Sequence, residues 1–226
     1  MIDESGFEKY LFSLELSAEN RSVRLLSILS AVIAVCRSEL TESMLGFLHK
    51  RKFDKDAIYE TILQSYLFLG FPRTIEAALA FNKIFGKIRE GRDIEKISPD
   101  ESESWFTNGL RLCRRVYGAN FENLKNRFSD VSPEIFRWMV IEGYGKVLSR
   151  PKMTHIEREL AEVAALIVDG RERQLLSHIL GSLNVGADMK LLMQVNRDIK
   201  PLAGDENSAL AEKIMANIIS KYETKK

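Results

Sequence analysis

Hydrophobic residues along this chain recur mostly every three or four positions, and the strict alternation typical of strands is nearly absent. Glycine and proline interrupt these runs and divide them into segments of helical length. The pattern predicts helices over residues 22–35, 38–51, 54–69, 72–89, 105–117, 133–148, 154–169, 174–183 and 206–222. We therefore expect an all-α fold.

Short polar side chains in front of the apolar runs predict where several helices begin. Asp54 precedes one run and can accept a backbone N–H as an N-cap. Thr154 and Glu157 have the Thr-x-x-Glu spacing of a capping box. Gly70 and Gly170 follow other runs, where a residue that tolerates a left-handed backbone can end a helix.

Two parts of the chain resemble each other weakly. Residues 30–56 can be aligned with residues 164–190, so that Lys52-Phe53-Asp54 matches Gly186-Ala187-Asp188. Each copy contains a helix, a short break and a capped helix, as duplicated halves that share one core would. The polar stretch from Gly86 to Ser102 is the best candidate for a linker. We therefore expect an N-terminal repeat over residues 1–97 and a C-terminal repeat over residues 98–226, packed as one unit.

Charge and composition restrict the classes of partner. The 226 residues contain 33 Lys and Arg against 32 Asp and Glu, a net charge of +1 that argues against a dedicated nucleic-acid surface. No apolar run approaches the roughly 20 residues that span a bilayer, and the acidic start MIDESGFEKY is unlike a secretory signal. The two cysteines, Cys36 and Cys113, form no CxxC motif, which favours a reduced, cytoplasmic setting.

The segment from Leu148 to Gly186 carries the strongest chemical signal. It predicts two helices around a polar corner, with Glu159 in the first and His178 in the second. An acid and an imidazole on adjoining helices can form a proton-transfer pair. The alternative is structural: a half-buried histidine, and a Glu159 that faces solvent or pairs with an arginine. Glu162 is expected to be the acid that faces solvent.

Three segments together resemble the carboxymuconolactone decarboxylase family, a branch of the alkylhydroperoxidase-D-like fold. They are residues 58–85, with the Gly70-Phe71-Pro72 corner, residues 142–151 (EGYGKVLSRP) and residues 157–186. The resemblance implies an alkylhydroperoxidase-D-like helical fold built from two degenerate repeats. It also implies a homo-oligomer, a trimer or a hexamer.

The peroxidase branch of that fold carries a glutamate, two cysteines and a histidine on this helix pair. Matched to this chain, Glu159 and His178 are retained, while the cysteine positions fall on Arg171 and Gln174. Neither side chain can replace a thiolate. We therefore expect no dithiol peroxidase activity at this site.

The resemblance instead implies a lyase that decarboxylates a small carboxylated lactone or ring compound by general acid/base catalysis. His178 would be the acid, Glu159 would orient it, and Gln174 would assist. Arg150 and Arg158 would bind a substrate carboxylate.

The first half has Leu25 and Met44 where the second has Glu159 and His178. We therefore expect a composite site in which Phe71, from the first half, forms a wall. No zinc spacing or phosphate loop is present, so no metal or cofactor is expected.

Two other functions remain open from the sequence. One is a non-catalytic oligomeric interaction or regulatory module on the same fold. The other is a peroxide or redox protein that uses Cys36 or Cys113 in a changed geometry. Cys36 is expected to be a buried thiol, and the arginines beside Cys113 could lower the pKa of that thiol.

Overall fold

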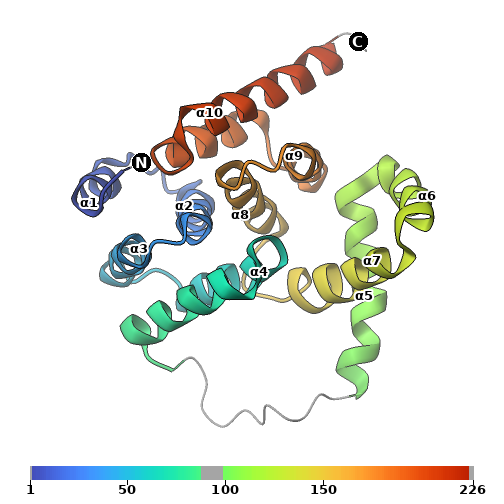
Figure 1. Cartoon of the computed structure of the whole chain (residues 1–226), viewed down its shortest axis with the longest axis horizontal. Helices are drawn as coiled ribbons and strands as arrows, with labels where there is room; N and C mark the ends of the chain where they lie inside the picture. Colours follow the sequence, from blue (N-terminus) through green and yellow to red (C-terminus); the bar gives the residue numbers. More distant parts are fainter. Residues whose placement is uncertain (1, 88–98, 224–226) are drawn as a thin grey trace.

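The computed structural model describes residues 2–87 and 99–223, and every regular element in these ranges is helical, which confirms the all-α prediction (Figure 1). The elements in order are α1 (Glu4–Ser13), α2 (Arg21–Val35), α3 (Ser38–Lys50), α4 (Lys55–Phe85), α5 (Pro99–Tyr117), η1 (Gly118–Asn120), α6 (Phe121–Val131), α7 (Pro133–Trp138), η2 (Met139–Leu148), α8 (His155–Val168), α9 (Glu172–Val185) and α10 (Met189–Glu223). None of the helices in the described ranges is long and apolar enough to cross a membrane.

The predicted caps begin the helices that they precede. Asp54 accepts the backbone N–H of Asp56 at 2.8 Å at the start of α4. The capping box of α8 is complete: Thr154 Oγ1 accepts from Glu157 N at 3.2 Å, and Glu157 Oε2 accepts from Thr154 N at 2.7 Å. Gly70, with φ 75° and ψ 167°, interrupts α4 where the sequence predicts a break. These local expectations are confirmed.

Three helices near the N-terminus match three near the C-terminus in spacing. The helices α2, α3 and α4 begin at Arg21, Ser38 and Lys55, and α8, α9 and α10 each begin 134 residues later, at His155, Glu172 and Met189. Positive-φ positions repeat at the same interval: Cys36, Lys52 and Gly70 in the first set, Gly170, Gly186 and Gly204 in the second. The interval equals that of the aligned segments 30–56 and 164–190.

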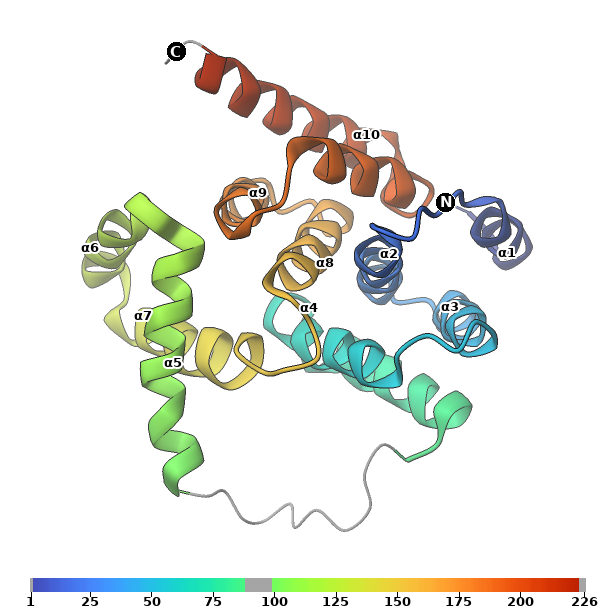
Figure 2. The same ribbon diagram turned by 180° about the vertical axis from the view of Figure 1, so that it is seen from behind.

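The first and fourth of these matching helices, α2 and α8, pack on each other at the centre of the molecule. Figures 1 and 2 show them between α4 on one side and α10 on the other. One continuous cluster of buried apolar side chains joins both sets of helices, with Leu25 and Ile28 from α2 and Leu160 and Val163 from α8 among its fully buried members. Burial of this shared apolar surface is the main favourable term that holds the two sets together.

The segment α5 to α7 has no partner at that interval among the described residues, and it covers only one side of the molecule. Helix α5 packs on η2 and α9 (Figure 1). Its backbone meets η2 at two glycines: a Cβ at Gly109 would lie 2.0 Å from Val140 O, and one at Gly145 would lie 2.0 Å from Trp105 O. Only glycine permits this approach. The predicted linker overlaps residues 88–98, which lie outside the described residues, as does the expected boundary at 97/98.

Candidate functional site

Glu159 of α8 and His178 of α9 meet inside the molecule. Their exposed fractions are 3% and 8%, and His178 Nδ1 lies 3.1 Å from Glu159 Oε2, within hydrogen-bond reach. The short corner at Gly170 lets the two helices pack directly on each other. The predicted approach of this acid and this imidazole is confirmed.

Glu162 is the third member of the cluster, and the expectation that it faces solvent is wrong. Three residues after Glu159, it lies on the same face of α8, and it is 1% exposed. Its Oε2 lies 2.9 Å from His178 Nδ1. Glu159 Oε2 meets the geometry of a hydrogen bond with Nδ1, whereas neither oxygen of Glu162 meets it with any described residue. Glu162 Oε2 is nevertheless the closer of the two carboxylate oxygens, and both its direct contact and its charge raise the pKa of His178.

The environment of this cluster favours a protonated imidazole. Burial alone would lower the pKa of His178, but the two carboxylates outweigh it and raise that pKa to about 10. Burial raises the pKa of Glu162 to about 7, and the charge of Glu159 acts in the same direction, against His178 and Arg158. At neutral pH the imidazolium is the favoured form, which suits a general acid.

Arg150 and Arg158 form a separate ionic cluster with Glu60 of α4. Arg150 Nη2 donates to Glu60 Oε1 at 2.8 Å, and Arg158 Nη2 donates to Glu60 Oε2 at 3.0 Å. Arg158 is 2% exposed and also donates to Gln64 Oε1 at 3.0 Å. The sequence predicted these two arginines as binders of a substrate carboxylate. The structure instead places them on Glu60, outside the lining of the pocket that reaches His178.

That pocket has a volume of about 640 Å³ and lies between α9, η2, the first part of α4 and the α6–α7 segment. His178 lies in its wall, and Gln174, one turn earlier on α9, lines it as expected from the sequence. The contacts of His178 with the carboxylates all use Nδ1, so Nε2 is the nitrogen available to a ligand. The ring of Phe68 stands edge-on to the imidazole, with centroids 5.2 Å apart.

The first half of the chain reaches the pocket through Phe68 rather than through Phe71. Phe71 is 65% exposed and does not line the pocket. It stacks on Tyr66 at 5.1 Å, and Tyr66 donates to Glu142 at 2.6 Å, which does line it. Phe71 therefore lies outside the wall that it was expected to form, and Tyr66 separates it from the lining residue Glu142. Phe68 lies three residues before Phe71, in the apolar run that ends at Gly70, and this position is the sequence signal that could have indicated it.

The two cysteines differ from their expected surroundings. Cys36 is exposed, at the left-handed end of α2, so the prediction of a buried thiol is wrong. Cys113 is fully buried, and burial raises the pKa of its thiol to about 12, with the charge of Glu159 acting in the same direction. The opposing effect of Arg114 is smaller. The expectation of a lowered pKa at Cys113 is also wrong.

The matching positions in the first set of helices hold no ionisable group. Leu25, Ile28 and Met44 stand 134 residues before Glu159, Glu162 and His178, and all three are fully buried. The same helix arrangement is therefore occupied by apolar packing in one half and by a charged cluster in the other.

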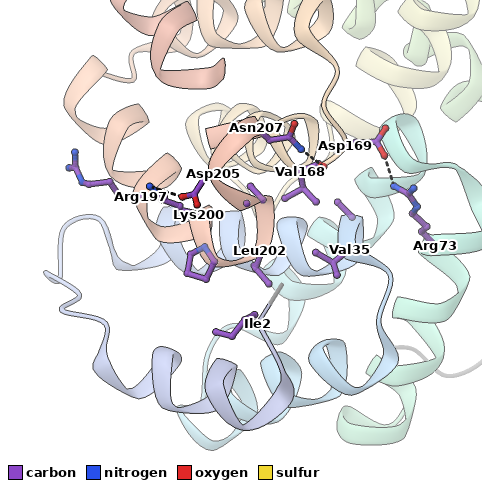
Figure 3. A pocket seen from close by; sticks show the side chains of 14 residues that line it. Ile2, Val35, Arg73, Val168, Asp169, Arg197, Lys200, Leu202, Asp205 and Asn207 are labelled. Atoms are coloured by element: carbon purple, nitrogen blue, oxygen red, sulfur yellow. Dashed lines mark hydrogen bonds and ion pairs between the residues drawn. The ribbon is translucent and has the colours of Figure 1, made fainter. Parts of the chain in front are cut away.

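A second, wider pocket of about 950 Å³ lies at the corner of α10, beside the ends of α2 and α8. Figure 3 shows two ion pairs among its charged side chains: Arg73 with Asp169 at 2.8 Å and Lys200 with Asp205 at 3.1 Å. The remaining one, Arg197, donates to Gln194 at 2.8 Å. Each lining carboxylate thus has a cation as its partner. The imidazole of His178 lies in the wall of the other pocket, and Glu159 and Glu162 contact its Nδ1 from outside the lining. We therefore place the candidate site there.

No protein-family model matches this chain, and no curated protein matches it either.

Proposed function

We propose that this protein is an alkylhydroperoxidase-D-like enzyme related to the carboxymuconolactone decarboxylases, built from two degenerate repeats, and that it protonates carbon in a small carboxylated lactone or ring compound. One observation carries the proposal. An imidazole is held through Nδ1 by two buried carboxylates, while its ring lies in the wall of a pocket large enough for a small molecule. The equal spacing of the two helix sets supports the repeat.

The proposed reaction uses His178 as an acid. Loss of CO2 leaves the electron pair of the broken C–C bond on carbon as an enolate. That pair forms a C–H bond with the proton on His178 Nε2, and water then returns a proton to the imidazole. Glu159 orients the ring, and Glu162 stabilises its charged form.

The test is CO2 release from 4-carboxymuconolactone and related carboxylated lactones, with deuterium incorporation at the protonated carbon in D2O. His178→Gln should lower turnover by about 10²–10⁴-fold, the range of a lost general acid. Arg171→Gln is the matched control, because Arg171 is exposed, pairs with Asp169 and lies outside the pocket lining. Turnover that His178→Gln leaves unchanged would exclude this role.

The second candidate is an oligomeric module without catalysis, and one surface favours it. Phe71, Ile75 and Leu79 follow one another every four residues along the second part of α4, and each is more than half exposed. The matching positions on α10 are Asp205, Ala209 and Lys213. We propose that this stripe joins copies of the chain into a trimer or hexamer. Light scattering of Ile75→Glu should then show a smaller particle, and an unchanged mass would exclude the stripe as the interface.

A further inference from the structure

We infer that Arg127 and Arg173 form an anion clamp at the pocket of His178, and that its ligand is a carboxylate with an apolar, mainly aromatic body. The inference rests on the proposed function for what happens at His178. The binding itself can be measured without turnover.

The two arginines enter the same pocket from different walls. Arg127 belongs to α6 and Arg173 to α9, and both line the cavity. Within the described ranges, neither guanidinium has a hydrogen bond or an ion pair. The lining acid Glu142 is engaged by Tyr66 and Lys146. Among the described lining residues, the charged side chains of α6 and α9 that lack a partner are thus positive. The paired N–H donors of two planar guanidinium groups suit a carboxylate.

The rest of the lining suits an apolar body. It includes the aromatic side chains of Phe68, Tyr117, Phe128, Trp138 and Tyr144. Trp138, Val131 and Ile135 are 64%, 69% and 49% exposed, although large apolar side chains gain from burial. All three line this pocket, so a ligand there would cover apolar surface that the chain itself leaves open.

The position of the clamp determines which carboxylate it holds. Arg173 lies five residues before His178 on α9, a rise of roughly 7.5 Å along the helix. Five residues also turn the chain by about 140° around the helix axis, so the two side chains leave α9 in different directions, and we expect a carboxylate on Arg173 to lie apart from the atom that faces His178. Moreover, two arginines stabilise a carboxylate in the ground state and would oppose its loss as CO2. The clamped group is thus one that the substrate keeps, and it sets specificity.

Calorimetric titration of the intact chain tests the clamp with two matched pairs of probes. The first pair is 4-phenylbutanoate and its neutral amide, and the second is octanoate and octanamide. We expect 4-phenylbutanoate to bind at least about tenfold more tightly than its amide, an advantage that falls as salt rises. Arg127→Gln and Arg173→Gln should each remove most of that advantage and leave the amide unchanged. Arg171→Gln should change neither.

Each outcome supports or overturns the inference. Equal affinity for acid and amide, or no binding of either acid at millimolar concentration, overturns the clamp. Tighter binding of octanoate than of 4-phenylbutanoate keeps the clamp and overturns the aromatic body. His178→Gln should still bind 4-phenylbutanoate. A clamp that binds this probe in a protein whose turnover does not depend on His178 would leave the inference standing while the proposed function fails.

Discussion

Arg24 and Asp198 are joined by two hydrogen bonds, from Nε to Oδ2 at 2.6 Å and from Nη2 to Oδ1 at 2.9 Å, although they belong to the two different sets of matching helices. Both are buried. The same interval of 134 residues leads from Arg24 to Arg158, and from Gln64 to Asp198. Arg158 in turn donates to Gln64. Each central helix thus sends an arginine to the third helix of the other set, and each arginine has a carboxylate there: Asp198 for Arg24, and Glu60, beside Gln64, for Arg158.

Asp198→Ala should lower the free energy of unfolding by about 3–5 kcal/mol, because it leaves the buried Arg24 without its counter-charge. The double variant Arg24→Met/Asp198→Leu should recover much of this loss, since no unpaired charge remains. Urea denaturation of the three proteins measures both effects. A double variant as unstable as Asp198→Ala would show that the loss comes from packing and not from charge.

Stability should fall as the pH rises from about 5 to about 9. The raised pKa of His178 makes its contribution full below about 6.5, and that contribution is lost as the pH rises toward about 10. The raised pKa of Glu162 acts in the same direction. The unfolded chain releases this proton near the ordinary pKa of a glutamate, whereas the folded protein holds it up to about pH 7. We expect Glu162→Gln to flatten the decline by at least about 1 kcal/mol, the equivalent of one pKa unit. Thermal melting at each pH measures the decline in both proteins. An equally steep decline in Glu162→Gln would show that Glu162 does not contribute to it.

Cys36 should react with a disulfide reagent in the folded protein, and Cys113 only after unfolding. Cys36 is exposed, whereas burial raises the pKa of Cys113 to about 12. Cys36→Ser should therefore abolish the fast phase of thiol labelling, and Cys113→Ser should leave it intact. We also expect no thiol peroxidase turnover. Peroxide reduction that disappears in either serine variant would restore the redox alternative.

Gly109→Ala and Gly145→Ala should each lower the free energy of unfolding by at least about 1–3 kcal/mol, the usual cost of overpacking. Each new Cβ would fall 2.0 Å from a carbonyl oxygen of the facing element, and backbone atoms cannot move aside cheaply. Gly143→Ala is the matched control in η2, the helix that also holds Gly145, because a Cβ there meets nothing within 4 Å. Hydrogen exchange should show faster opening of α5 in the first two variants only. Equal behaviour of all three would mean that α5 is not held by this contact.

Phe68→Ala should weaken binding of 4-phenylbutanoate, while Phe71→Ala should leave it unchanged. Phe68 lines the pocket and contacts the imidazole of His178, whereas Phe71 lies outside the lining and stacks on Tyr66. Isothermal titration of both variants gives the comparison. A larger effect from Phe71→Ala would support the composite site as the sequence predicted it, with Phe71 as the wall.

Much of the helical framework could be predicted from the sequence, because its signals are local. Asp54 and Thr154 cap the helices that they precede, and Gly70 interrupts α4 where the pattern breaks. The pairing of Glu159 with His178 was also accessible, since a short corner forces consecutive helices to pack on each other.

The rest depends on contacts between distant segments. The sequence predicts a solvent-facing Glu162 because a charged residue on a helix usually faces solvent, and only the packing of α9 on α8 buries it. Arg150 and Arg158 turn to Glu60, which lies 90 and 98 residues before them in the chain. The pocket wall on α6 and α7 could not be placed from the sequence, because nothing local indicates that these helices lie over His178.

The difference between the two halves also bears on how much sequence change each can absorb. Glu159, Glu162 and His178 place ionisable groups where Leu25, Ile28 and Met44 contribute apolar burial. A buried carboxylate without a hydrogen bond costs stability. Under the proposed function, this cost is a stability–activity compromise. Because both halves share one core, the free energy gained by apolar burial in the first half can offset the cost of the charged cluster in the second. Mutations that loosen the first half should therefore narrow the set of changes that the charged cluster can tolerate.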